Sequence, residues 1–125
     1  MCSSDLEAGA DVVLAARTAS QLEETAQEVR ATGRQALPIP TDVTRKDNVE
    51  KLMDAAIRTL GGLHILVNNA GINVNLGWRK VMNINLMAVM NGTMVAMERM
   101  VKAGKPCQII NTASTGTYFI FNIDI

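Results

Sequence analysis

Two amides follow an apolar run near the middle of the chain. Ile65–Val67 leads directly into Asn68 and Asn69, and Ala70 and Gly71 come next. Short polar side chains and a glycine at the end of a buried strand let the backbone come close to a bound molecule. In open α/β sheets, ligands bind beyond the carboxyl ends of the strands. The stretch therefore predicts a ligand site at the end of a strand.

Four more polar side chains are associated with apolar segments. Arg17, Asp42 and Ser114 each come directly after such a segment, where a predicted strand would end. Asn85 lies inside a mostly apolar helical segment, and a buried amide is costly unless it is hydrogen-bonded. We therefore expect Asn85 to have a specific task. Asn83 is the competing amide, two residues away and on a different helical face.

The apolar pattern predicts strands that alternate with helices. Continuous apolar runs are typical of parallel strands covered on both faces, and apolar residues at every third or fourth position indicate helices. Glycines end each helix. This order predicts an α/β fold with a doubly wound parallel sheet of about four strands and three helices. The strands are expected at Ala10–Ala16, Gln35–Ile39, Ile65–Val67 and Gln108–Thr112, and the helices at about 18–32, 44–60 and 78–102. Capping boxes are expected from Thr18 with Gln21 or Ser20 with Glu23, and from Thr44 with Asp47.

Composition excludes several classes of partner. The 125 residues carry 12 basic and 12 acidic side chains, and no basic run is interleaved with aromatics, so we expect no nucleic-acid partner. No apolar stretch is long enough to span a membrane, so we expect no membrane partner and a cytoplasmic location. Cys2 and Cys107 are expected to be free thiols, and they have no metal-binding spacing. Residues 1–7 lack any structural period and are expected to be a non-native or disordered start.

The tetrapeptide Asn68–Gly71 after an apolar strand resembles the structural signature of the short-chain dehydrogenase/reductase family. The resemblance extends from about Ala8 to Thr115. It implies a three-layer, Rossmann-like NAD(P)-binding domain, present in part over residues 8–125. It also implies an oxidoreductase that transfers hydride between NADP(H) and a small-molecule carbonyl or alcohol. The protein would supply binding and orientation while the cofactor carries the chemistry.

The resemblance assigns the cofactor residues. Arg17 stands where NAD-preferring relatives end the strand in a carboxylate, and a guanidinium there can pair with the 2′-phosphate of NADP. We therefore favour NADP, with NAD still possible. The competing interpretation of Arg17 is a solvated residue at a helix start. The implied cofactor-binding residues are Arg17 for the 2′-phosphate, Asp42 and Val43 for adenine, and Asn69, Ala70 and Gly71 for the adenosine ribose.

The resemblance also assigns two catalytic residues. Asn85 would hold a water in the proton relay, and Ser114 would bond the reacting oxygen of the substrate without acting as a nucleophile. The family's Tyr-x-x-x-Lys pair falls just beyond Ile125, and Tyr118 has Asn122 where the lysine would be. The chain also begins at what resembles the family's second strand, after the glycine-rich turn. We therefore expect this chain by itself not to turn over substrate. No metal site is expected, and the single histidine, His64, is interpreted as a strand-edge residue.

The family's first strand would lie between the strands near Val13 and Leu66. Without it, these two strands lose a shared neighbour. Either two apolar edges are exposed, or the two halves slide together in another register.

The third helix carries a methionine stripe, and small residues form its other face. Two packed faces on one helix suggest a second partner, so we expect the 78–102 helix to pair with another copy in a homo-oligomer. The alternatives are an intramolecular core and a copper-thioether site. The stripe consists of Met87, Met90, Met94 and Met97, and the small face consists of Asn85, Ala88, Gly92 and Ala96.

Two other functions compete with the enzyme. The chain could be a nucleotide-binding or interaction scaffold without catalysis, or a gene fragment with no function of its own. Binding of NADPH without turnover would favour the scaffold.

Overall fold

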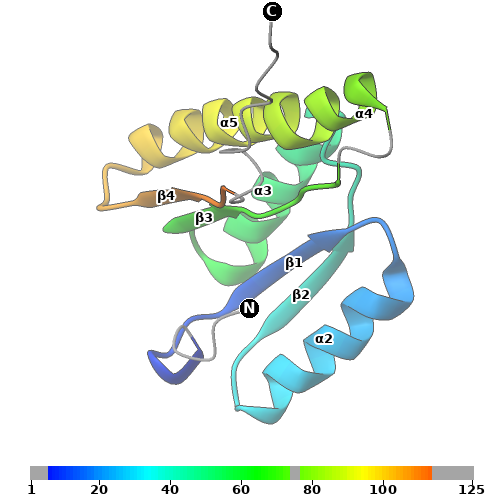
Figure 1. The fold of residues 1–125 in the computed structure, drawn as a ribbon. Coiled ribbons are helices and arrows are strands. Elements are labelled where there is room, and N and C mark those ends of the chain that lie inside the picture. The colour runs from blue at the N-terminus through cyan, green and yellow to red at the C-terminus, as the bar shows by residue number, and fades with distance from the viewer. Residues whose placement is uncertain (1–5, 74–76, 114–125) are drawn as a thin grey trace, which may run out of the picture.

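A computed structural model describes residues 6–73 and 77–113 (Figure 1). Strands and helices alternate along the chain in the predicted order. The elements are β1 (Val12–Ala16), α2 (Ala19–Ala31), β2 (Ala36–Pro40), α3 (Lys46–Leu60), β3 (Ile65–Asn68), α4 (Trp78–Met82), the π-helical segment η2 (Asn83–Met87), α5 (Ala88–Ala103) and β4 (Gln108–Asn111). The predicted α/β class with parallel strands is confirmed.

The four strands form two separate parallel pairs. β1 pairs with β2, with Val12 opposite Ala36, and β3 pairs with β4, with Ile65 opposite Gln108. In the described residues no ladder joins β1 to β3. The first of the two expected arrangements is therefore observed, because β1 and β3 each keep one unpaired edge (Figure 1).

Helices lie on opposite sides of the strands. α2 packs against β1 and β2, whereas α3 and α5 pack against each other and α5 also contacts β3. Figure 1 shows α2 and α5 at opposite ends of the layered arrangement, with the strands between them. The core between α3, α5 and the β3–β4 pair consists of Val49, Met53, Val95, Ala96 and Met100, with Leu63, Leu66, Cys107 and Ile109 packed against it.

One face of the β3–β4 pair is uncovered. Side chains alternate between the two faces of a strand, so Leu66 points into the core while its neighbours point away. Ile65 and Val67 are 52% and 51% exposed, and Ile110, which pairs with Val67, is 43% exposed. The expectation of full burial is also wrong for β1, which is half-buried at Val12–Leu14 and exposed at Ala15 and Ala16.

Both prolines of β2, Pro38 and Pro40, lie within the strand. Val12 N donates to Gln35 O and Thr41 N donates to Ala16 O, so the odd-numbered residues of β2 face β1. Pro38 and Pro40 therefore face the outer edge, where their missing N–H groups cost no ladder bond. The prolines mark β2 as an edge strand.

The sequence predicted the C-terminal ends of the helices correctly, but it did not predict how the N-terminal ends are capped. Gly61 and Gly104 adopt the left-handed conformation, with φ of 81° and 62°, as predicted for C-terminal glycines. The predicted capping boxes are wrong, because neither Thr18 nor Arg45, the observed N-cap residues, makes a side-chain capping bond. The Thr44 hydroxyl donates to Asp42 instead.

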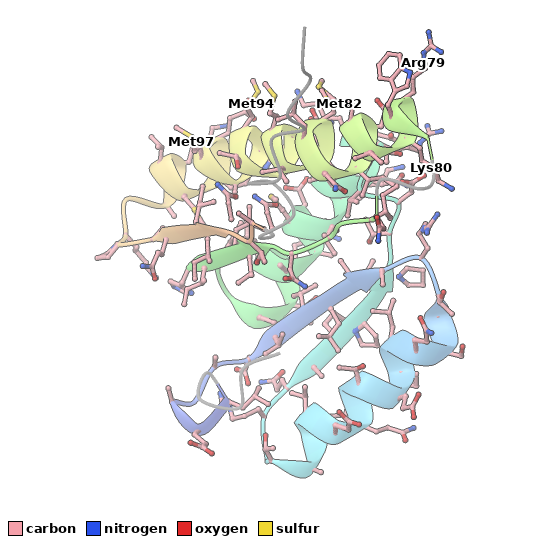
Figure 2. All side chains as sticks on the ribbon, viewed as in Figure 1. Arg79, Lys80, Met82, Met94 and Met97 are labelled. Atoms are coloured by element: carbon pink, nitrogen blue, oxygen red, sulfur yellow. The ribbon has the colours of Figure 1, made fainter. Side chains whose placement is uncertain are left out.

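The predicted 78–102 helix is one helical rod interrupted by η2. A π-helical turn inserts an extra residue and often marks a functional site. Ala88, Gly92 and Ala96 are buried, as expected for the small-residue face, whereas the fourth residue of that face, Asn85, is exposed and the expectation that its amide is buried is wrong. Figure 2 shows Met82, Met94 and Met97 on the opposite side of the rod, pointing away from the strands. Over the described ranges, no helix combines the length and apolar character needed to cross a bilayer.

Candidate functional site

The predicted site residues follow the carboxyl ends of the strands, as expected. Arg17 follows β1, Asp42 and Val43 follow β2, and the exposed segment 69–71 follows β3. Ser114, which would follow β4, lies outside the described residues. The described site residues form two groups, one beside β1 and β2 and one beside β3, and no hydrogen bond among described residues joins them.

The first group is organised by a tight acidic turn. Asp42 Oδ1 accepts hydrogen bonds from Thr44 Oγ1 at 2.7 Å and from Thr44 N at 3.0 Å. These two bonds, followed by the positive charges of Arg17 and Arg45, hold the pKa of Asp42 below its usual value because they favour the ionised form. Asp42 is therefore a carboxylate at neutral pH, with Arg17 close enough to act on it electrostatically.

The strand ends of this group are tied together by the backbone. Thr41 is buried, its N–H donates to Ala16 O at 2.8 Å, and its hydroxyl donates to Ile39 O at 2.9 Å. This arrangement fixes the start of the turn next to Arg17. Arg17 itself is exposed and forms no ion pair with any described residue, so its guanidinium is available to a ligand.

The second group is held by Asn85. Its Oδ1 accepts from Ile72 N at 2.8 Å, and its Nδ2 donates to Ile72 O at 2.9 Å. The amide thus pairs with both backbone groups of one residue, as a neighbouring strand would. Asn85 reaches Ile72 from η2, and the segment that follows Gly71 is fixed to the long helix by these two bonds. Asn83, the competing amide, makes no such contact among the described residues.

Asn68 ties three elements together. Its Nδ2 donates to Asn111 Oδ1 at 2.9 Å, at the end of β4, and lies 3.2 Å from Thr93 Oγ1 on α5. Its backbone carbonyl accepts from Thr112 N at 3.1 Å. One amide therefore connects β3, β4 and α5 where both strands reach the candidate site.

Gly92 makes the approach to Asn68 possible. A Cβ atom on Gly92 would lie 2.5 Å from Asn68 Oδ1, closer than real Cβ contacts allow. Gly92 is buried within α5, where glycine costs about 1 kcal/mol of helix stability relative to alanine. The close contact explains why this helix carries a glycine in its interior.

Sequence reasoning missed part of this arrangement. It placed Gly92 on the close-packing face of the helix but did not identify Asn68, Thr93 and Asn111 as a hydrogen-bonded group. An isolated glycine in a helix interior was a usable signal, because such a glycine usually has a packing reason. The pairing of Asn68 with Asn111 could not be read from sequence, since it depends on the register of β3 with β4.

The site has the character of a binding surface for a polar molecule. It offers an exposed cation, a carboxylate fixed by a turn, and an exposed loop, each of which follows the carboxyl end of a parallel strand. No cluster of three His, Cys, Asp or Glu side chains suited to a metal ion occurs among the residues that the structure describes.

Comparison with known sequences identifies relatives across nearly the whole chain. The sequence model of a family described as short chain dehydrogenase matches residues 1–121. 3Beta-hydroxysteroid dehydrogenase 2 of Eggerthella lenta is 37% identical over 118 residues, which cover 87% of this chain and 45% of that protein. 1-Deoxy-11-beta-hydroxypentalenate dehydrogenase of Streptomyces exfoliatus is 31% identical, over 90% of this chain and 45% of that protein.

Solved structures show the same similarity. A short-chain type dehydrogenase/reductase from Mycobacterium marinum superposes with a TM-score of 0.84 at 35% identity, covering 92% of this chain and 50% of that one. A short chain dehydrogenase/reductase from Burkholderia phymatum, in complex with NAD, gives 0.83 at 31% identity, covering 90% of this chain and 43% of that one. The chain spans about half the length of the relatives that it matches.

The contact between Gly92 and Asn68 gives a direct test of the site's packing. Gly92→Ala is expected to lower the free energy of unfolding by about 1–3 kcal/mol, because the new methyl group overpacks against Asn68 Oδ1. Denaturant titration measures the change. Gly71→Ala is the matched control, since its Cβ would meet only Asn85 Oδ1 at 3.7 Å and should change stability by less than about 0.5 kcal/mol.

A double variant separates the clash from other effects of the alanine. In an Asn68→Ala background, Gly92→Ala should cost nothing further, because the atom that it would strike is gone. A Gly92→Ala variant at least as stable as the unchanged chain would contradict the close contact.

Proposed function

Because this chain belongs to the short-chain dehydrogenase family, we propose that the protein from which it comes is an oxidoreductase that transfers hydride between NADP(H) and a carbonyl or alcohol. The observation that carries the proposal is the polar edge at the carboxyl ends of the strands, where Arg17 and the 69–71 loop are exposed and Asp42 is half-buried. The names of two relatives, a hydroxysteroid dehydrogenase and a hydroxypentalenate dehydrogenase, support an alcohol or carbonyl substrate class. Residues 8–125 would form part of the cofactor-binding domain, and residues 1–7 would lie outside its fold.

The surroundings of Arg17 support NADP. A 2′-phosphate needs positive charge and hydrogen-bond donors, and Arg17 stands two residues before α2 begins. The first turn of α2 contains no acidic residue, and the Thr18 side chain makes no capping bond, so its hydroxyl can also donate to a ligand. The partial positive charge of a helix N-terminus adds to this attraction. NAD is the second candidate, because a similar structure holds NAD.

The other cofactor residues are proposed from their positions. Asp42 and Val43 would contact adenine, and Asn69, Ala70 and Gly71 would line the adenosine ribose. The dinucleotide would supply the hydride when bound. The chain's own part is to fix this binding edge, with Asn85 holding the 71–72 backbone and Asn68 holding the ends of β3 and β4 together.

Two residues are proposed to serve the reacting oxygen. Asn85 would hold a water of the proton relay, and Ser114 would hydrogen-bond the substrate oxygen. In the described structure both polar atoms of the Asn85 amide bond Ile72, so Asn85 would act while its orientation is fixed by that segment. Since Tyr118 has no lysine four residues later, we propose that residues 1–125 alone do not turn over substrate.

We propose that the intact protein is a homo-oligomer that pairs through the outward face of the 78–102 helix. Met87, Met90, Met94 and Met97 on this face are between 45% and 55% exposed, so they are not part of the described core. Contiguous exposed apolar side chains mark interaction surfaces, and the flexible thioethers of methionine adapt to a second helix.

The nucleotide proposal predicts a preference between two small probes. We expect 2′,5′-ADP to bind this chain about tenfold more tightly than 5′-AMP, since a charge-assisted bond between Arg17 and the 2′-phosphate contributes about 1.5 kcal/mol. Isothermal titration calorimetry measures both affinities. Arg17→Asp should abolish the preference, whereas Arg58→Asp makes the same charge change on exposed α3 and should preserve it. Equal affinities for the two probes in the unchanged chain would refute the assignment of Arg17.

The oligomer proposal predicts that introducing charged residues into the methionine stripe lowers the mass of the assembly in solution. The chain should self-associate in sedimentation velocity, and the double variant Met94→Glu/Met97→Glu should sediment as a monomer because two carboxylates cannot be buried in an apolar interface. Gln21→Glu/Gln27→Glu, on the exposed side of α2, is the matched control. Self-association that survives in the methionine variant would place the contact elsewhere.

A further inference from the structure

A cavity lies at the opposite end of β3 and β4 from the candidate site. It opens where α3 and α5 end, beside the residues that immediately precede β3 and β4. Its volume is about 330 Å³, within the range of small-molecule pockets. Its lining includes Ile57, Leu63, His64, Lys102, Lys105 and Cys107. None of these residues belongs to the proposed nucleotide site.

The floor of this cavity is apolar because its polar groups are already bonded. The Cys107 thiol contacts two carbonyl oxygens, Lys105 O at 3.2 Å and Leu63 O at 3.5 Å. Sulfur and the side chains of Ile57 and Leu63 therefore present a soft apolar surface. Such a floor favours the hydrocarbon part of a ligand.

The rim of the cavity is basic. Lys102 and Lys105 are exposed, and neither appears in any ion pair among the described residues. Arg99 also lines the cavity, but its guanidinium is bonded to Asp54 at 3.2 Å and to Glu98 at 2.9 Å. The lining contains no acidic residue. Two lysines that form no ion pair among the described residues thus line a largely apolar cavity.

The positive charge of Lys102 and Lys105 suits a ligand group that carries a single negative charge. Phosphate groups favour helix N-termini and free arginine forks, but here both helices present their carboxyl ends and Arg99 is occupied. Those carboxyl ends also carry partial negative charge, which offsets part of the charge of Lys102 and Lys105. A carboxylate is therefore better matched than a phosphate dianion.

His64 forms one wall of the cavity and depends on a glycine. A Cβ on Gly62 would lie 2.6 Å from His64 Cε1, so the imidazole lies directly over the glycine backbone. The turn Gly61–Gly62 therefore gives the wall its position. The imidazole also provides a probe, because this is the only histidine in the chain.

We propose that this cavity binds a small organic carboxylate with an apolar body. The apolar part would rest on Ile57, Leu63 and Cys107, and the carboxylate would face the ammonium groups of Lys102 and Lys105. The site is separate from the nucleotide edge, and ligand binding there does not require the hydride-transfer function.

Octanoate is the test ligand, and the His64 imidazole resonances are followed by NMR. We expect a saturable shift, with binding about fivefold or more tighter than that of octan-1-ol, because the alcohol cannot pair with the lysines. Octylamine should bind less tightly than the alcohol. The preference for octanoate should shrink as salt is added, since the lysines are exposed.

Two variants and a control complete the test. Lys102→Gln/Lys105→Gln should remove the preference for octanoate over octan-1-ol, whereas Lys46→Gln/Lys51→Gln, on the far end of α3, should retain it. Gly62→Ala should shift the His64 resonances before any ligand is added and weaken octanoate binding. The proposal is overturned by an absent or unsaturable shift, by equal binding of octanoate and octan-1-ol, or by His64 resonances at random-coil positions.

Discussion

The Asn68 amide is the contact on which the carboxyl edge of this chain depends. It lies at the end of β3 and is bonded to Asn111 of β4 and to Thr93 of α5. Its position requires Gly92, because any side chain there would strike it. A polar network of this kind is stabilising only when its members are all satisfied, and no buried side-chain polar atom in the described residues lacks a partner. The exposed loop that begins at Asn69 therefore starts from a fixed point.

The long helix meets opposite requirements on its two faces. Toward the strands it must approach closely, and buried Ala88, Gly92 and Ala96 allow this. Its other face carries the methionines Met87, Met90, Met94 and Met97, which are between 45% and 55% exposed. Between them, η2 turns Asn85 toward Ile72, so one helix both packs on the sheet and fixes a loop of the site. The same rod ends at Gly104, beside the basic cavity, so the candidate site and this cavity lie at opposite ends of the β3–β4 pair.

Local signals predicted much of this fold. The order of strands and helices and the glycines at helix ends are determined by nearby residues, and they were predicted from apolar spacing and from Gly61 and Gly104. The predictions were wrong where burial or hydrogen-bond partners depend on residues far apart in the sequence. β1 is only half-buried and keeps one unpaired edge, and Thr44 bonds Asp42 rather than capping α3. In the site, the positions of Arg17 and Asp42 follow from strand ends, but the Asn68–Asn111 pair depends on strand register.

The central claim is that this strand-end edge belongs to a hydride-transferring enzyme. Sequencing the source DNA through both ends of the reading frame tests it most directly. The account predicts a strand with a glycine-rich turn encoded upstream of Ala8, and a Tyr-x-x-x-Lys motif encoded just after Ile125. A start codon at Met1 with no coding sequence before it, or a stop codon directly after Ile125, would contradict the enzyme assignment, because the remaining scaffold would hold neither the phosphates nor the proton donor.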